Sequence, residues 1–449
     1  MVRRLSGFFT RIMHHYLPDA YLFAISLTFI SFILAMIFTD VGFLGLVQSW
    51  GQGITGILGF AMQMILILIT GYALAQSAPV KRMLGKIALL AKSPAQAVFV
   101  VAFVAAVASW INWGFGLVIG GLMALEMARR HRAHFALLVA AAYSGFTIFG
   151  MGLSSSIGLI TATPDSPQNY VNKVFDVVIP LSGTIFTWWN LIPAILLAVT
   201  MPFVMSLAHP KKKDVQAIDP SKIDDSKVAD TEDEQKEKKD LTFSQRLENS
   251  RILNYIFFAL GAIYIIGYFI HNGFNLDINT VILIFLFAGI LLHGTPIAYV
   301  RVIQSAIKGT SGIALQFPVY GGIQGLMSAG LASVISGWFV AISSEHTFYL
   351  LQFLGAGLIN MFVPSAGGQW ITQGLITTKA AAALGMDPAK AAMSVAWGDQ
   401  WTNMIQPFWA LPILGMAGLK AKDIMGYTVM ILIWAGLVLG AMTVVMSYL

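Results

Sequence analysis

The feature that most constrains this chain is a set of long, nearly uncharged apolar runs spread over its whole length. Runs at 20–39, 56–75, 186–208, 252–270 and 424–446 have about the length that a helix needs to cross a bilayer. Only 11% of the 449 residues are charged, whereas a soluble domain carries about 25%. Because the runs lack the period-two pattern of a transmembrane barrel, we predict an all-α polytopic membrane protein.

The composition excludes several other classes of protein. The chain contains no cysteine, which rules out disulfides, zinc-thiolate sites and thiol catalysis. It shows no P-loop, catalytic triad or metalloprotease helix, so we predict no enzyme activity, no metal site and no cofactor beyond a coupling ion. We attribute the net charge of +6 to membrane topology and expect no nucleic-acid partner.

The positive charges predict the orientation in the membrane. With the N-terminus in the cytoplasm, all 27 Lys and Arg residues except Lys173, Lys379 and Lys390 fall on the cytoplasmic side. This distribution follows the positive-inside bias and predicts a multi-pass protein of the inner membrane. Residues 1–18 are predicted to be an amphipathic segment on the cytoplasmic surface, and 209–250 a charged, solvated cytoplasmic loop.

The two halves of the chain carry similar short segments in the same order. GFAMQM at 59–64 matches GIALQF at 312–317, and SWIN at 109–112 matches GLIN at 357–360. We therefore predict two membrane repeats, 19–208 and 276–449, each with a hairpin and a broken helix, joined by a linker helix at 251–271. Segment 78–93 carries four Lys or Arg residues and its partner 331–345 carries none, which predicts an inverted-topology repeat.

Four stretches interrupt the apolar helices with glycine, amide and hydroxyl residues, at 112–116, 145–158, 360–370 and 398–407. Unpaired backbone is costly in lipid, so these breaks must be buried or line a wet cavity. No Lys or Arg lies in them, and we expect neutral donors and helix N-termini to hold a carboxylate. The predicted substrate-binding residues are Asn112, Trp113, Gly114, Gly116, Ser154, Ser155, Ser156, Asn360, Ser365, Gly367, Gly368, Trp370, Trp401, Asn403 and Gln406.

These stretches also have plainer interpretations. Glycine and serine often serve close helix packing in membranes, and a single tryptophan is often a packing or interfacial residue. The charges leave open whether each hairpin is re-entrant or crosses the membrane twice, because both versions return to the same side.

Asp399 differs from the other acids because it lies in an apolar surround at a predicted helix break, with no cation near it in sequence. An intramembrane carboxylate is a candidate functional group. It could bind a proton, ligate a sodium ion together with backbone carbonyls, or cap the end of a broken helix. Glu126, in contrast, lies one turn from Arg129 and Arg130 and is predicted to form a structural ion pair.

The same stretches carry a family resemblance. The chain resembles the bacterial short-chain fatty acid transporter family nearly end to end. The most telling segments are 110–121 (WINWGFGLVIGG) and 400–412 (QWTNMIQPFWALP), and 77–80 and 360–370 also resemble the family. The resemblance implies uptake of small carboxylates of the acetoacetate and butyrate class. A more distant similarity to the ion-transporter superfamily with inverted repeats implies a homodimer.

We therefore predict a secondary active importer, a symporter of short-chain fatty acid anions with H+ or Na+. The alternatives are an uncoupled channel or facilitator for small monocarboxylates, and an intramembrane enzyme. The enzyme would need a catalytic dyad or a metal cluster, and the sequence offers neither.

Overall fold

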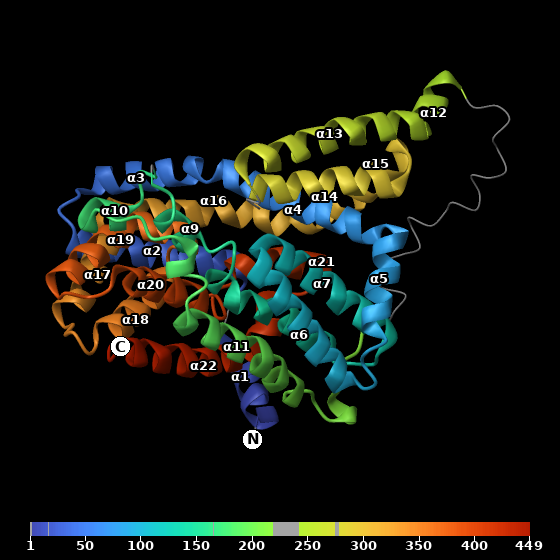
Figure 1. The fold of residues 1–449 in the computed structure, drawn as a ribbon. Helices are drawn as coiled ribbons and strands as arrows, with labels where there is room; N and C mark the ends of the chain where they lie inside the picture. The colour runs from blue at the N-terminus through green and yellow to red at the C-terminus, as the bar shows by residue number, and fades with distance from the viewer. Residues whose placement is uncertain (1, 17, 165, 219–241, 274–277) are drawn as a thin grey trace.

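The computed structural model describes residues 2–16, 18–164, 166–218, 242–273 and 278–449. Every regular element in these ranges is a helix, and eight segments are long and apolar enough to cross a membrane. The predicted all-α polytopic fold is thus confirmed (Figure 1). Most of the predicted loop 209–250, and the predicted start of the second repeat at 276, lie outside the described residues.

The first half of the chain runs from the amphipathic α1 to α11. Its helices are α1 (Val2–Tyr16), α2 (Ala20–Phe38), α3 (Phe43–Gly56), α4 (Leu58–Gln76), α5 (Ala78–Ala88), α6 (Pro94–Ile111), α7 (Trp113–Arg130), α8 (Phe135–Ser144), α9 (Ser156–Thr161), α10 (Tyr170–Phe175) and α11 (Trp188–Leu207). The 3-10 segment η1 (Gly145–Met151) interrupts the path from α8 to α9. The short α10 is not among the predicted elements.

The rest of the chain includes the predicted linker helix, which is α13 (Arg251–Asn272). Its helices are α12 (Phe243–Glu248), α13 (Arg251–Asn272), α14 (Ile278–His293), α15 (Pro296–Ala306), α16 (Ser311–Leu326), α17 (Ala332–Ala341), α18 (Phe348–Asn360), α19 (Ala366–Ala383), α20 (Pro388–Thr402), α21 (Leu411–Ala417) and α22 (Ala421–Met446). From α14 onward the order of long and short helices, hairpin, broken helix and final helix repeats that of α2 to α11, apart from α10. The inversion of one half relative to the other stays a prediction.

Capping side chains shape both hairpin tips. Asn112 has an extended backbone between α6 and α7, and its Oδ1 accepts hydrogen bonds from the N–H groups of Gly114 and Phe115, each at 3.0 Å. Ser365 begins α19, and its Oγ accepts from the N–H of Gly368 at 3.4 Å. Such caps satisfy donors that would otherwise be left unpaired at a buried helix start.

Burial separates the core of the molecule from its periphery. In the most apolar 18-residue stretch of the broken helix formed by α8, η1 and α9, 89% of the residues are buried, whereas 11% are buried in the corresponding stretch of α13. Figure 1 shows α13 along one side of the helical body, next to α14. The interrupted backbone is thus sheltered by protein, as the cost of unpaired amides in lipid requires, and the unbroken α13 offers its side chains to lipid.

Glycine allows α3 and α16 to cross at very short range. A Cβ at Gly53 would collide with the carbonyl oxygen of Gly321, and one at Gly325 with the carbonyl oxygen of Ser49. Small residues permit this backbone approach, a common device in membrane proteins. Beyond α16 the helix kinks at η7 (Met327–Leu331), where Gly330 has a φ of 131° that favours glycine.

Candidate substrate and ion site

The tip of the second hairpin is hydrogen-bonded to the break that ends α20. The Asn360 Nδ2 donates to Thr402 Oγ1 at 3.0 Å and to Asn403 Oδ1 at 2.9 Å. The Thr402 hydroxyl donates in turn to the carbonyl oxygen of Gly357 on α18 at 2.8 Å. Two predicted site residues, Asn360 and Asn403, are therefore in direct contact.

The first hairpin tip is bonded to the other broken helix in the same manner. The N–H of Trp113 donates to Ser154 Oγ at 2.9 Å, and the N–H of Leu153 donates to the carbonyl oxygen of Trp110 at 2.8 Å. Ser155 then caps α9 by accepting from the N–H of Gly158 at 3.3 Å. Ser156 is the first residue of α9 and is half-buried.

The two broken helices also meet each other. The Oε1 of Gln400 accepts from the N–H of Gly150 in η1 at 2.7 Å, and the Tyr143 hydroxyl donates to the carbonyl oxygen of Asn403 at 2.8 Å. After Asn403 the chain reaches Trp409, whose ring centroid lies 5.0 Å from that of Trp113. The break between α20 and α21 therefore contacts both hairpin tips.

Asp399 lies one turn before this break and is almost fully buried, with 1% of its surface exposed. Neither of its carboxylate oxygens has a hydrogen-bond partner among the described residues. Burying an unpaired carboxylate is strongly unfavourable, and a bound proton or cation would relieve this cost.

Several amides of the second hairpin and of the α20–α21 break also have a buried atom without a hydrogen-bond partner in the described chain. These atoms are Asn360 Oδ1, Gln369 Oε1, Gln400 Nε2, Asn403 Nδ2 and Gln406 Nε2. Buried polar atoms are nearly always paired in native proteins, with protein, water or ligand. The region thus combines unused acceptors around a buried acid with unused amide donors.

A cavity of about 360 Å³ opens beside the second hairpin tip, and we call it the hairpin pocket. This volume is near the lower end of the range of about 300–1,000 Å³ for small-molecule sites. Its lining includes Ile57 and Phe60 at the α3–α4 elbow, Gln324 on α16, and Ser365. Ser365 is the one predicted site residue in the lining.

The N-terminus of α19 provides the positive end of a helix dipole at this pocket. The N–H of Gly367 has no hydrogen-bond partner in the described chain, and open space surrounds its Cα. A Cβ at Gly368 would collide with the amide nitrogen of Gln324, which places that amide against the helix start. Free amides at a helix N-terminus suit an anion such as a carboxylate.

Some predicted site residues have partners that indicate packing roles instead. The indole of Trp401 donates to the carbonyl oxygen of Leu432 at 2.7 Å, and that of Trp370 donates to Gln168 at 2.9 Å. Gly114 and Gly116 provide close contacts, because a Cβ would collide with Ile67 at the first position and with Ser109 at the second. Both indole N–H groups therefore donate to acceptors outside the hairpin pocket.

Three polar residues of this region were missed in the sequence analysis. Gln324 lines the hairpin pocket, while Tyr143 and Gln400 connect the two broken helices. Gln324 lies in the GGIQG segment at 321–325, where a lone amide among glycines could have been noticed. Tyr143 lies in an apolar run and carries no comparable signal.

The predicted ion pair of Glu126 is confirmed. Its carboxylate is 2.6 Å from Arg130 Nε and 3.4 Å from Arg129 Nη1. No group of three or more His, Asp or Glu side chains with metal-site geometry occurs in the described part of the chain.

Comparisons with known proteins agree on one family. A model of the family described as "Short chain fatty acid transporter" matches residues 1–446. An Escherichia coli (strain K12) protein named as a candidate short-chain fatty acid transporter is 44% identical over 440 residues, covering 98% of each chain. A Haemophilus influenzae protein with the same name is 44% identical over 439 residues, covering 97% of each.

Solved structures show weaker likeness over similar lengths. The YdaH transporter of Alcanivorax borkumensis has a TM-score of 0.44 and 16% identity, with 96% of this chain and 98% of that chain covered. MtrF of Neisseria gonorrhoeae has a TM-score of 0.36 and 14% identity, with 97% of each chain covered. Both TM-scores are below 0.5, and the fold described above stands on the helices of this chain itself.

Proposed function

Because this chain belongs to the short-chain fatty acid transporter family, we propose that it imports short-chain fatty acid anions by symport with H+ or Na+. The family is one of transporters and not of enzymes. Acetoacetate and butyrate represent the substrate class that we propose. Import across the inner membrane, a cytoplasmic N-terminus and a homodimeric assembly are parts of the same proposal.

The observation that carries the proposal is the buried, unpartnered carboxylate of Asp399 in a core of unpartnered amides. A channel for anions has no use for a buried acid, which repels its cargo until the acid is neutralised. A symporter can use a buried acid, because the proton or sodium ion that neutralises the acid makes anion binding favourable. The coupling follows from this electrostatic dependence.

The hairpin pocket offers the substrate both a polar and an apolar end. We place the carboxylate at the start of α19, where the N–H of Gly367, the Ser365 hydroxyl and the Gln324 amide can donate. The short alkyl tail then lies on Ile57 and Phe60 across the pocket. No charged side chain is needed for this mode of binding, because helix N-termini supply the positive potential.

The unused acceptors around Asp399 suit either coupling ion. A proton on the carboxyl group would turn it into a donor for an amide oxygen such as that of Asn360. A sodium ion would instead take the carboxylate with amide and carbonyl oxygens, the hard ligands that such cations prefer. The two cases differ in which gradient drives uptake.

Uptake of labelled butyrate into proteoliposomes tests the function, with the sodium and pH gradients varied independently. We expect one inward gradient to stimulate uptake in the natural chain. In Asp399→Asn the ratio of uptake with the gradient to uptake without it should fall to near one, because the amide has no charge for an ion to neutralise. Asp40→Asn, at an exposed position between α2 and α3, is the matched control.

Two outcomes would contradict the proposal. Unaltered gradient dependence in Asp399→Asn would remove Asp399 from coupling. Butyrate flux that never exceeds its own gradient, under any ion gradient, would identify a facilitator in place of a symporter.

A further inference from the structure

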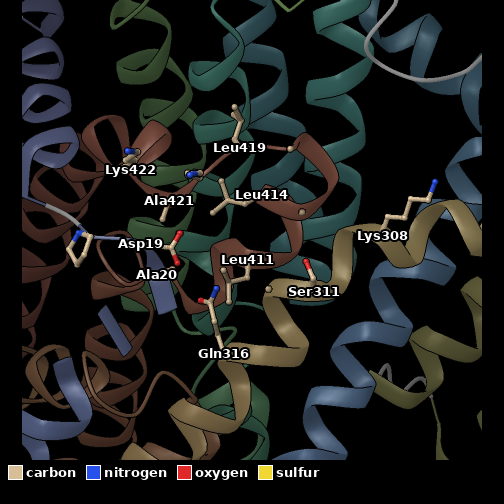
Figure 2. Close-up of a pocket in the computed structure, with 15 residues that line it drawn as sticks. Asp19, Ala20, Lys308, Ser311, Gln316, Leu411, Leu414, Leu419, Ala421 and Lys422 are labelled. Atoms are coloured by element: carbon tan, nitrogen blue, oxygen red, sulfur yellow. The ribbon is translucent and has the colours of Figure 1, made fainter. Parts of the chain in front are cut away.

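A second pocket lies at the other end of α16, and none of the roles given above involves it. It has a volume of about 340 Å³ and is enclosed by the starts of α2, α16 and α22 and by α21 (Figure 2). We call it the lysine pocket. The polar side chains that line it are Asp19, Lys308, Ser311, Gln316, Lys420 and Lys422.

This pocket is electropositive. It holds three lysines against one aspartate, and none of these lysines forms an ion pair within the described residues. The N-termini of α2, α16 and α22 lie at this pocket. Asp19 accepts from the N–H of Tyr21 at the start of α2, and Asp423 accepts from the N–H of Lys420 at the start of α22 at 2.8 Å, whereas α16 continues from the 3-10 turn η6 (Ile307–Thr310) without a side-chain cap. The aspartates offset the dipoles of α2 and α22, so the positive potential that favours an anion comes chiefly from the lysines.

Gln316 gives the pocket an unused polar group on its inner side. The residue is 8% exposed, and its Oε1 has no hydrogen-bond partner in the described chain. Its Nε2 faces Gly312, which also lines the pocket. Figure 2 shows the Gln316 amide beside Leu411, with Asp19 and Ser311 on either side. Either end of this amide can face a ligand after a half-turn of the group.

Aromatic rings pack between the part of α16 that lines the lysine pocket and the part that lines the hairpin pocket. Phe317 follows Gln316 on α16 and is stacked on Phe408 with ring centroids 3.9 Å apart. On its other side, Phe317 lies 6.1 Å from Phe60, which lines the hairpin pocket. The two pockets thus occupy opposite ends of one helix, with Phe317 between them.

We propose that the lysine pocket is a second carboxylate-binding site, which receives the substrate anion on its way to the cytoplasm. Lys420, Lys422 and Gln316 hold the carboxylate, and Leu411 and Leu414 contact the alkyl tail. Lys308 extends away from Gln316 and contributes positive charge at the edge of the pocket (Figure 2). Phe317 and Phe408 form the barrier between the two sites. This inference rests on the proposed function, because the ligand is the transported anion.

The absence of cysteine in the natural chain permits a direct test of binding. Ser311→Cys places one thiol in the lysine pocket, and Leu419→Cys provides a second position on its lining. The labelling rate of each is measured with an anionic and with a cationic methanethiosulfonate, with and without butyrate. Ser244→Cys, on exposed α12, is the control.

We expect the ratio of the anionic to the cationic labelling rate to be about tenfold higher at Ser311→Cys than at Ser244→Cys. Butyrate should slow labelling at the two pocket positions and not at Ser244→Cys. Adding Lys308→Gln, Lys420→Gln and Lys422→Gln should reduce this preference by about two- to fivefold for each lysine, the range of a partly exposed charge pair. Equal reagent preference at both positions overturns the proposal.

Labelling in nanodiscs of zwitterionic lipid, with or without anionic lipid, separates two sources of anion. Protection by butyrate in zwitterionic lipid supports the carboxylate site. Protection by anionic lipid and not by butyrate identifies a headgroup site and overturns it.

Butyrate uptake measured on the same preparations separates this inference from the proposed function. If butyrate uptake is intact but butyrate does not protect the lysine pocket from labelling, the proposed second binding site is overturned and the proposed function is not. Protection without any uptake overturns the proposed function, together with the role of the pocket in transit. Phe317→Ala should raise butyrate flux in the absence of an ion gradient, whereas Phe103→Ala, at an exposed position on α6, should not.

Discussion

Each hairpin tip carries an asparagine, and the two side chains form different hydrogen bonds. Asn112 uses its side-chain oxygen to cap the helix that follows it, whereas Asn360 extends from the end of α18 to the break after α20. The first side chain therefore shapes its own hairpin, and the second ties the hairpin to the neighbouring helix. A tip held by such bonds can be released only if they are replaced, so we expect Asn360 to be a sensitive position in the proposed transport cycle.

Gln324 offers a sharper test of the hairpin pocket, because it lines the pocket and its amide lies against the start of α19. Gln324→Ala removes a donor for the carboxylate, and we expect the KM for butyrate to rise about ten- to 150-fold, the range for a lost hydrogen bond to a charged group. Initial uptake rates over a range of butyrate concentrations measure it.

The control for this prediction is Gln304→Ala, an exposed amide on α15. An unchanged KM in Gln324→Ala, with the protein correctly folded, would place the substrate outside the hairpin pocket.

At the scale of the elements, the contact between α3 and α16 leaves no room for a single added methyl group at its glycines. Gly53→Ala forces a methyl group against the backbone of α16, and overpacking of this kind costs about 1–3 kcal/mol. Gly51→Ala on the same helix meets nothing within 4 Å and gains the higher helix propensity of alanine. Thermal unfolding in detergent should therefore show a lower Tm for Gly53→Ala and an equal or higher Tm for Gly51→Ala.

Equal Tm values for these two variants would show that α3 and α16 are not in close contact. Because both substitutions change the same residue type on one helix, expression and detergent effects should cancel between them.

The start of α8 is bound to the segment that follows α11 by two histidines. The His134 Nδ1 accepts from the N–H of Gln216 at 3.0 Å, and His209 Nε2 accepts from the N–H of His134 at 3.3 Å. Burial, and secondarily the nearby His209, lowers the pKa of His134 from 6.5 to about 4. Burial likewise lowers the pKa of His209. Both rings therefore act as neutral acceptors at neutral pH.

Because the pKa of His134 is lower in the docked state, docking is fully favourable above pH 6.5 and is lost as the pH falls from 6.5 towards 4. The shift sets an upper limit of roughly 3 kcal/mol on this loss. Hydrogen exchange of residues 209–218, corrected for the intrinsic rate at each pH, should increase over that interval.

His134→Gln should remove most of this pH dependence, whereas His346→Gln, on the exposed loop before α18, should leave it unchanged. Exchange that does not vary between pH 7.5 and 4.5 in the natural chain would contradict the docking role of His134.

At the scale of the whole molecule, basic side chains collect where α5 meets α7. A Cβ at Gly85 would lie 2.7 Å from Arg130 Nη2, so Arg130 lies against the helix that carries Lys81, Arg82 and Lys86. The α17–α18 connection carries Glu345 and has no lysine or arginine. This separation of charge agrees with the predicted orientation.

Cysteine labelling in whole cells tests that orientation. Ser244→Cys should react with a membrane-impermeant maleimide only after permeabilisation, whereas Glu345→Cys should react in intact cells, because the predicted orientation places these two exposed positions on opposite sides of the membrane. The natural chain, which has no cysteine, gives the background. Labelling of both positions in intact cells would reject the orientation and, with it, the inverted repeat.

The sequence by itself determined the helices of this protein, because their causes are local. Apolar runs of bilayer length favour spans, and residues such as Asn112 and Ser365 end one helix and begin the next through bonds to their own neighbours. The breaks at α8–α9 and α20–α21 were predictable for the same reason. Asp399 could be singled out because a lone acid in an apolar run has few ordinary explanations.

Only the tertiary structure decided which of these groups meet. The bond from Asn360 to Asn403, the bond from Gly150 to Gln400, and the lysine pocket all join segments that are far apart in the chain. It also turned Trp370 and Trp401 towards packing partners, which no local pattern indicates. Helix formation depends on neighbours along the chain, whereas a site depends on how whole helices pack against one another.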